Sequence, residues 1–426
     1  MKLPRLERRP ELDALRGLFL VWMTLTHLPT RFSDFVNQPI GFVSSAEGFV
    51  FISAMLVGRL YTRDSMVDAT GTRKRLWKRS LKIYWYHLLM LALAFTVAAG
   101  LAVHLHKSAI TNLLDFYLAH PFVAVIGSVL LLYCPPLLDI LPMYVTFLFF
   151  TPMVLSAALR FGWRKVLAAS GLVWLLAQFG VRDLVHNWIV HITHLRIPLQ
   201  ETGAFNLFAW QGVWTFGLWI GAGSALNLPV LRKVPGWAAA LSLAVCLFFI
   251  GIRHRWLGPH LTQQALGIQL DKWQIGPLRV LNLVTFSIVL YWLRKYLLKL
   301  VAIEPFLTLG KATLRVFCTH IFFVFAGLAL LAGDVDDADG VPQLHGAPAI
   351  ALVAVTMAAM ILVAVNEVRK KRAQRTRPGS EEAAPQEGKE AGPLPGDSQE
   401  MACVRRVGVC GPQLTSPQEN VAFPAA

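Results

Sequence analysis

The sequence predicts an all-α fold, a polytopic transmembrane bundle of about ten spanning helices. Of its 426 residues, 55% are hydrophobic and only 15% are charged, and the mean hydropathy is +0.52. Soluble domains carry about 25% charged residues, so this composition indicates a lipid environment. The formal net charge is +15, but Lys and Arg occur in short clusters between apolar runs. That distribution argues against a nucleic-acid partner and indicates membrane lipid instead.

Each predicted span is an apolar run of the length that crosses the hydrocarbon core, which takes about 20 residues. In order, these runs are 12–30, 42–60, 82–103, 141–159, 165–181, 206–226, 237–252, 278–298, 313–332 and 347–366. Asp13 and Arg16 interrupt the start of the first run, which predicts an uncleaved helix rather than a signal peptide. The stretch 119–133 is shorter and precedes Pro135-Pro136, so we expect a re-entrant or outer-surface helix there.

The basic residues predict the orientation, because cytoplasmic loops of membrane proteins are enriched in Lys and Arg. With a cytoplasmic N-terminus, alternate loops hold Arg59, Arg63, Arg73, Lys74, Arg75, Lys78, Arg79, Lys82, Arg160, Arg164, Lys165, Arg232, Lys233, Arg294, Lys295 and Lys299. An opposite loop carries Asp334, Asp336, Asp337 and Asp339. Both termini are therefore expected in the cytoplasm. We predict a membrane domain over 1–370 and a basic, then disordered, cytoplasmic tail over 371–426.

The first span carries a cation and a titratable group on one face. Arg16 and His27 are eleven residues apart, which is three helical turns plus about 20° and separates them by about 16 Å. Charges at membrane depth are costly and mark functional paths. Arg binds phosphate or carboxylate, and His can take a proton from a hydroxyl. The structural alternative is that Arg16 reaches the inner headgroups while His27 only ends the helix.

The first span, ELDALRGLFLVWMTLTHLP, resembles the membrane acyltransferase type 3 superfamily, and more closely its OpgC branch, which is linked to succinylation of osmoregulated periplasmic glucans. The motif is R-x10-H, in which the Arg belongs to LDALRG and the His to TH. Further matching blocks are SSAEGFVFISA (44–54), LPMYVTFLFFTPMVL (141–155), FNLFAWQGVWTFGLWIG (205–221) and LGKATLRVFCTH (309–320). The resemblance extends from about residue 5 to about residue 366, in the family's order.

The resemblance implies roles for individual residues. His27 would be the catalytic base, and Arg16 would contact the acyl donor. Glu47 stands where the superfamily has an acidic residue, and it would orient His27 or contact acceptor hydroxyls. Arg75 and Arg79 fall in a loop similar to the superfamily's Arg-rich stretch and lie one helical turn apart, so they could bind the phosphates of acyl-CoA. The structural alternative is that they anchor the chain to lipid.

Three further residues also have functional hypotheses. His320 lies in the motif LGKATLRVFCTH and would line the donor path, or else be a neutral histidine satisfied by a neighbouring helix. Trp210 and Gln211 form an amphipathic pair near the outer end of a predicted span, where contacts to the acceptor sugar are plausible. Most other Trp and Tyr residues lie near span ends, which is typical of interfacial anchors.

The residues give no reason to expect a metal ion or a bound cofactor. His186, His191 and His194 cluster in one outer loop, but only Asp183 and Glu201 lie near them, which is poor for a metal site. The chain contains no GxSxG, HExxH, Walker or GxGxxG motif. The absence of these motifs leaves direct transfer of the acyl group with the help of a histidine base, and acyl-CoA would be the co-substrate.

Together with the resemblance, these features predict a multi-pass O-acyltransferase of the bacterial inner membrane. It would transfer an acyl group from cytoplasmic acyl-CoA to a hydroxyl of a periplasmic glucan or other glycan. The resemblance implies a succinyl group, whereas the residues alone do not distinguish succinyl from acetyl. One competing hypothesis is a transporter or flippase for a glycan or lipid-linked sugar, which would predict mid-membrane carboxylates; Glu47 and Glu367 instead lie near span ends. Another is a non-catalytic scaffold or sensor. The oligomeric state does not follow from the sequence.

Overall fold

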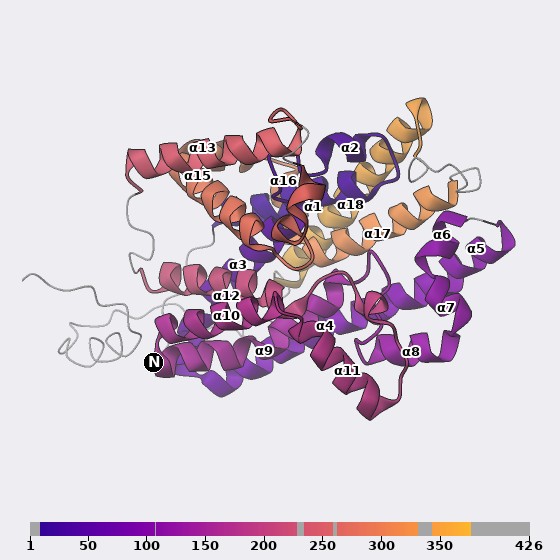
Figure 1. Ribbon diagram of the computed structural model, residues 1–426, viewed down its shortest axis with the longest axis horizontal. Coiled ribbons are helices and arrows are strands. Elements are labelled where there is room, and N and C mark those ends of the chain that lie inside the picture. Colours follow the sequence, from indigo (N-terminus) through magenta and orange to yellow (C-terminus); the bar gives the residue numbers. More distant parts are fainter. Residues whose placement is uncertain (1–8, 107, 228–233, 259–261, 331–342, 376–426) are drawn as a thin grey trace, which may run out of the picture.

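The computed structural model of the protein describes residues 9–106, 108–227, 234–258, 262–330 and 343–375, and this part of the chain is helical (Figure 1). The longer helices are α1 (Pro10–His27), α3 (Ser45–Val67), α4 (Ala69–Leu93), α9 (Ile140–Phe161), α10 (Trp163–Ala177), α11 (Val181–Thr193), α12 (Leu207–Ala225), α13 (Gly236–Arg253), α15 (Pro277–Val301), α17 (Thr313–Leu330) and α18 (Gly346–Arg375). The shorter segments are α2 (Phe32–Val36), η1 (Ala94–Ala98), α5 (Ala99–His104), α6 (Ser108–Leu113), α7 (Asp115–Ala119), α8 (Pro121–Val129), η2 (Leu199–Thr202), α14 (Gln263–Leu266), η3 (Gly267–Leu270) and α16 (Phe306–Lys311).

Within the described residues, six helical stretches are long and apolar enough to cross a membrane. They are Ala69–His104, Ile140–Phe161, Gly236–Arg253, Pro277–Leu297, Thr313–Leu330 and Gly346–Gln374. Helices α10 and α11 make a seventh if they form one span bent by 78°. Every predicted segment coincides with a helix. The count of ten crossings and the orientation of the termini, however, stay predictions.

The other predicted spans correspond to helices with a more polar or shorter sequence. Helices α1 and α3 carry buried ionisable residues, among them Asp13 and Glu47, and α10 has only 15 residues. Helices that pack inside a bundle need less apolar surface than helices that face lipid. The stretch 119–133 contains α8, whose nine residues reach about 14 Å, well short of the membrane core of about 30 Å.

Two predicted regions fall partly or wholly outside the described residues. Helix α18 continues to Arg375, beyond the predicted domain boundary at residue 370, and the rest of the predicted tail lies outside the described part. The predicted acidic loop, residues 334–339, lies outside it as well.

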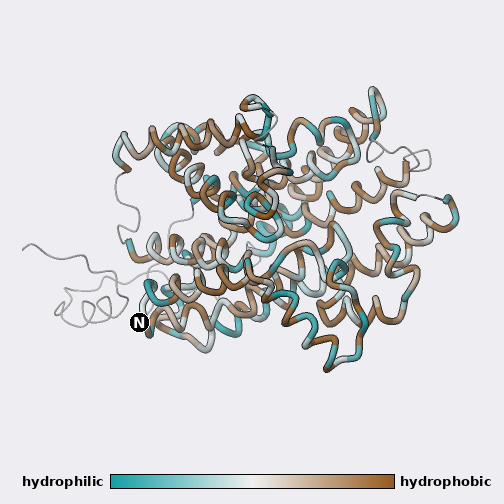
Figure 2. The backbone as a smooth tube through the Cα atoms, viewed as in Figure 1, coloured by the Kyte–Doolittle hydropathy of each residue, from teal (hydrophilic) through white to brown (hydrophobic). Residues whose placement is uncertain are grey.

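Apolar side chains cover much of the surface, while several ionisable groups lie inside. Phe122, Phe179 and Trp237 are more than 70% exposed, whereas Glu47 and Arg279 are fully buried. The backbone coloured by hydropathy shows brown helices at the periphery in Figure 2. This distribution is typical of a protein in lipid, where polar groups face the protein interior.

Helix α1 lies in the middle of the bundle, packed against α3, α16 and α17 (Figure 1). Two glycines permit the close approach of α16. A Cβ on Gly17 would overlap the backbone of Phe306, and a Cβ on Gly310 would overlap the backbone of Asp13. The residues of α1 are therefore held at fixed positions relative to the start of α17.

Candidate active site

Helix α1 carries both residues that the first motif singles out. Pro10 occupies its first turn, where a missing N–H is tolerated. Leu28 leaves the helical conformation, with φ −64° and ψ 133°, because a residue before proline, here Pro29, disfavours the α region. His27 is therefore the last helical residue, and Arg16 lies near the other end of the same helix.

The imidazole of His27 lies against that of His320 on α17. The distance from His27 Nδ1 to His320 Nε2 is 3.4 Å, and the rings stack with centroids 5.7 Å apart. His320 is fully buried, with the ring of Phe317 edge-on at 4.7 Å. Within the described residues, Nδ1 of His320 has no hydrogen-bond partner. A bond between the two rings requires a proton on only one of the facing nitrogens.

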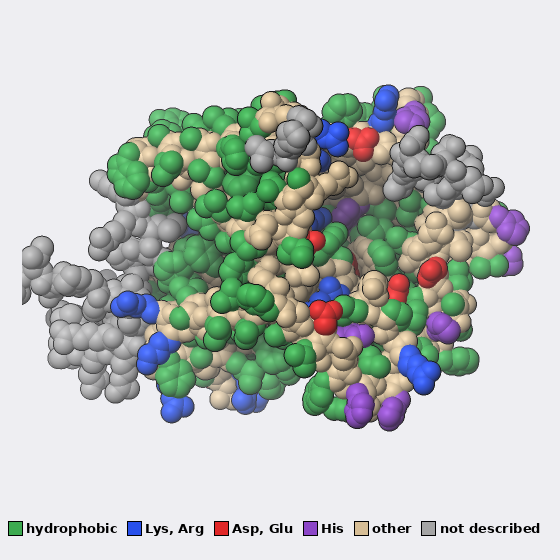
Figure 3. Space-filling model, in the orientation of Figure 1, with side chains coloured by type: hydrophobic (Ala, Val, Ile, Leu, Met, Phe, Trp, Pro, Cys, Tyr) green, Lys and Arg blue, Asp and Glu red, His purple; other side chains and the backbone are tan. Residues whose placement is uncertain are grey.

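His27 lines a cavity of about 310 Å³, which we call the His27 pocket. Its other lining residues come from α1, the 37–46 segment, the first residue of α9 and three loops: Trp22, Met23, Thr26, Asn37, Gln38, Ser44, Ser45, Ala46, Pro136, Leu137, Asp139, Ile140, Ala204, Phe205, Lys272 and Trp273. In Figure 3, charged and histidine side chains gather around a hollow near the centre of a mainly apolar face. The His27 pocket combines a candidate base with several hydrogen-bonding groups, as a sugar-binding site requires.

A second cavity, which we call the basic pocket, contains Arg16 and has a volume of about 290 Å³. Its cationic lining residues are Arg16, Arg79, Lys82, Lys311, Arg315 and Lys371. The guanidinium of Arg16 donates to Thr313 Oγ1 at 2.5 Å. Glu367 forms ion pairs with Arg315 at 2.7 Å and with Lys371 at 3.2 Å. The excess of positive charge suits the phosphate groups of a nucleotide-containing donor.

The two pockets approach each other next to the histidine pair. Ile140, at the start of α9, lines both pockets. Phe317 lines the basic pocket and contacts the ring of His320, which in turn contacts His27. Arg16 and His27 therefore belong to separate pockets that share Ile140 as a lining residue.

The structure separates the two predicted phosphate-binding arginines. Arg79 lines the basic pocket, whereas Arg75 is absent from its lining. The guanidinium of Arg75 is half-exposed and bonds to Asp64 at 3.1 Å and to Thr72 at 2.9 Å. Arg79 therefore lies among the cations of the basic pocket, while the contacts of Arg75 belong to the surface of α4.

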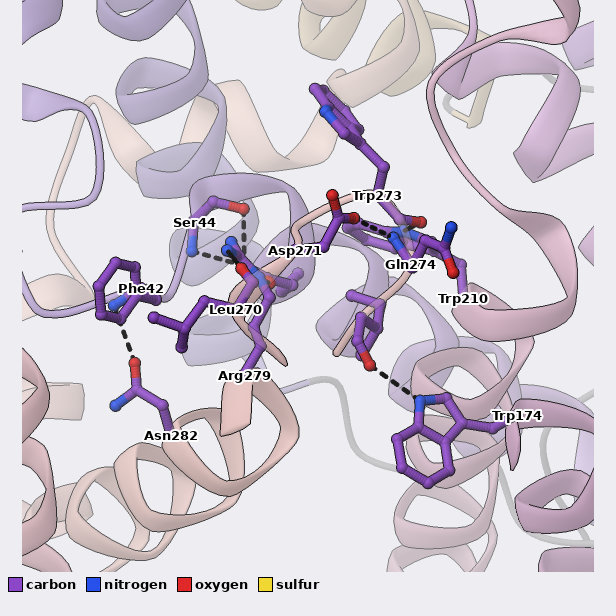
Figure 4. Close-up of polar contacts among 12 residues, drawn as sticks. Phe42, Ser44, Trp174, Trp210, Leu270, Asp271, Trp273, Gln274, Arg279 and Asn282 are labelled. Atoms are coloured by element: carbon purple, nitrogen blue, oxygen red, sulfur yellow. Dashed lines mark hydrogen bonds and ion pairs between the residues drawn. The ribbon is translucent and has the colours of Figure 1, made fainter. Parts of the chain in front are cut away.

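Glu47 holds the start of α3 and pairs with an arginine that the sequence interpretation missed. Its carboxylate accepts from the N–H of Ser44 at 2.5 Å and from the Ser44 hydroxyl at 2.6 Å. It also forms an ion pair with Arg279 of α15, with both side chains buried. Figure 4 shows Arg279 close to Ser44. Arg279 donates to the carbonyl of Leu270 as well, at 3.3 Å. The expected contact between Glu47 and His27 is not among its hydrogen bonds.

Trp210 and Gln211 lie outside the lining of the His27 pocket. Trp210 is fully buried, and its indole N–H donates to the carbonyl of Trp273 at 3.1 Å. Gln211 donates to the carbonyl of Ser170 at 2.8 Å and accepts from the Ser170 hydroxyl at 2.7 Å. Trp210 therefore supports a wall of the pocket from behind, and Gln211 joins α12 to α10.

The His27 pocket contains two ionisable residues that the sequence interpretation missed, Asp139 and Lys272. Burial raises the pKa of Asp139 to about 6, and the hydrogen bond from the N–H of Ala204, 3.0 Å away, counteracts part of that rise. Burial lowers the pKa of Lys272, while the charge of Glu47 acts in the opposite direction. Both lie in connections between helices, where no spacing pattern distinguishes them from other loop residues.

The described residues contain no group of three or more His, Cys, Asp or Glu side chains that could hold a metal ion. In the histidine cluster 186–194, His186 bonds to the carbonyl of Ile197 at 2.8 Å.

The fold and its pockets define a class, a multi-pass membrane protein with a histidine site between two polar cavities. The model of a family described as "OpgC protein" matches residues 8–372. The chain belongs to the OpgC family, and membership implies transferase activity, with a membrane acyl- or succinyltransferase role. No curated protein and no solved structure matches it.

Proposed function

We propose that the protein is an O-acyltransferase of the bacterial inner membrane, with His27 as general base. It transfers an acyl group, succinyl by family, from cytoplasmic acyl-CoA to a hydroxyl group of a periplasmic glucan or other glycan. The observation that carries the proposal is the position of the His27–His320 pair between two cavities: His27 lines the His27 pocket, and Phe317, which contacts His320, lines the basic pocket.

The donor binds in the basic pocket. Arg16 and Arg79 line that pocket and offer guanidinium groups to the phosphates of CoA. On a helix, Arg16 and His27 are separated by about 16 Å, which the extended pantetheine arm has to cover. The thioester then lies near Ile140, which both pockets share.

The acceptor binds in the His27 pocket. When Nδ1 of His27 carries its proton and donates to Nε2 of His320, Nε2 of His27 is left as the basic atom. That nitrogen takes the proton of the sugar hydroxyl while the oxygen attacks the thioester carbonyl. The carbon–sulfur bond then breaks, and the CoA thiolate takes the proton from His27 and leaves as the thiol.

The test is acyl transfer by membranes that contain the protein, supplied with labelled succinyl-CoA or acetyl-CoA and a glycan acceptor. Mass analysis of the glycan should show a labelled ester with the wild-type protein. His27→Ala should lower the rate by about 10²–10⁴-fold, the usual contribution of a general base, while acyl-CoA binding persists. The matched control is His191→Ala, since His191 is exposed on α11.

Two results would overturn the proposal. One is an unmodified glycan with either donor, as expected of a transporter or flippase without transferase chemistry. The other is an undiminished transfer rate in folded His27→Ala protein, which would leave His27 a structural role only.

A further inference from the structure

The His27 pocket contains a cation without a carboxylate partner. The ammonium group of Lys272 lies over the indole of Trp273, 4.4 Å from the ring centroid. Among the described residues, no carboxylate forms an ion pair with it within 4.0 Å. At longer range, Lys272 interacts electrostatically with Glu47, Arg279, Asp139 and His27. Lys272 is half-buried, and a cation in this position favours an anion in the pocket, because a partly desolvated charge is costly without a close counter-charge.

The other charges around the pocket already have partners. Glu47 pairs with Arg279 and accepts two hydrogen bonds from Ser44. Asp139 accepts the N–H of Ala204 at 3.0 Å. Lys272 is therefore the charged lining residue of the His27 pocket for which the described chain shows no hydrogen bond and no ion pair.

The backbone on either side of Lys272 is held in place by side chains from three helices (Figure 4). The carbonyl of Trp273 accepts the indole N–H of Trp210 at 3.1 Å, and that of Ile275 accepts the indole N–H of Trp174 at 2.9 Å. Leu270, two residues before Lys272, bonds to Arg279.

Two further bonds complete this support. The side chain of Asp271 accepts the N–H of Gln274 at 2.6 Å. The carbonyl of Gln274 accepts the amide of Gln178 at 2.9 Å. A segment fixed in this way holds its charged side chain near one position, and such preorganisation is what makes a charge selective.

We propose that Lys272 binds the terminal carboxylate of a dicarboxylic acyl group, and thereby selects dicarboxylic acyl donors over neutral acyl donors of the same length. This inference rests on the proposed function. In that function the donor arrives from the basic pocket, so the acyl chain beyond the thioester points into the His27 pocket. A terminal carboxylate then meets Lys272, whereas a methyl terminus leaves the ammonium unpaired.

The experiment compares succinyl-CoA with butyryl-CoA, a neutral donor of the same chain length, on a neutral glucan acceptor. In Lys272→Met, which keeps most of the side-chain length without the charge, kcat/KM for succinyl-CoA should fall about ten- to a hundredfold. The value for butyryl-CoA should stay within about threefold of wild type. Lys272→Arg should retain most of the preference for succinyl-CoA, because it keeps the charge.

The same measurements separate the possible failures. A wild-type protein that transfers neither acyl group refutes the proposed function itself. If the wild-type protein is active but Lys272→Met keeps the wild-type succinyl-to-butyryl ratio, the assignment of Lys272 is refuted. An equal fall in kcat/KM with both donors is one form of this result, because it leaves the ratio unchanged. An anionic glycan acceptor could also supply the negative charge that binds Lys272, so the comparison is repeated with such an acceptor. If Lys272→Met lowers kcat/KM only with the anionic acceptor, whichever donor is used, then Lys272 binds an acceptor anion and the proposal is overturned.

Discussion

The Nδ1 atom of His27 lies 3.4 Å from the Nε2 atom of His320, although 293 residues separate them in the chain. His320 is fully buried, whereas His27 lines a pocket. The pair therefore has an accessible member and an inaccessible one. This arrangement favours His27 as the group that meets substrate and His320 as the group that positions it.

A first prediction concerns the role of His320. We expect His320→Phe to lower kcat at least about tenfold, because the ring that orients His27 loses its nitrogen. The KM for acyl-CoA should be unchanged. His320→Gln, which can still accept a hydrogen bond, should recover part of the rate. Steady-state kinetics with purified protein measure both constants. A raised KM with unchanged kcat would instead support the role in donor binding that the sequence suggests.

A second prediction separates the two arginines of α4. Arg79→Ala should raise the KM for acyl-CoA about tenfold or more, because Arg79 lines the basic pocket and a charge-assisted contact to phosphate is lost. Arg75→Ala is the matched control. It removes only a half-exposed contact with Asp64, and such pairs contribute little. Binding of CoA to the purified variants checks both expectations. Equal losses in the two variants would contradict the separation.

A third prediction concerns the buried pair of Glu47 and Arg279. Replacing one partner leaves the other charge buried without a counter-charge, which typically costs about 3–5 kcal/mol. Glu47→Gln and Arg279→Met should therefore both lower the thermal unfolding temperature in detergent. The double variant Glu47→Leu/Arg279→Met should recover part of that loss. A Glu47→Gln protein with wild-type stability and abolished transfer would show that Glu47 acts in catalysis instead.

A fourth prediction follows from Asp139, whose pKa burial raises from 3.8 to about 6. The folded protein therefore holds a proton that the unfolded chain releases between pH 4 and 6, and the stability contributed by this group falls as the pH rises through that range. The penalty above pH 6 is at most about 3 kcal/mol. In Asp139→Asn this pH dependence should disappear. Thermal unfolding from pH 4 to pH 8 measures the difference. Parallel pH profiles for the two proteins would be inconsistent with a raised pKa.

The sequence by itself determined the membrane character, the helices and the family. Long apolar runs interrupted by basic clusters leave few alternatives to spanning helices, because lipid requires every backbone hydrogen bond to be made internally. Each predicted run is a helix in the structure. The spacing of Arg16 and His27 also followed from the sequence, since residues of one helix have a fixed separation.

Only the tertiary structure brought His27 together with His320, Asp139 and Lys272. These residues come from α17, from the residue before α9 and from the loop before α15, and periodicity carries no information on which helices pack together. The structure likewise separated Arg79 from Arg75, and it joined Glu47 to Arg279. Residues of one helix have a spacing that can be read from the sequence. A pocket is lined by residues of several helices and loops, and their relative positions depend on the packing of the whole chain.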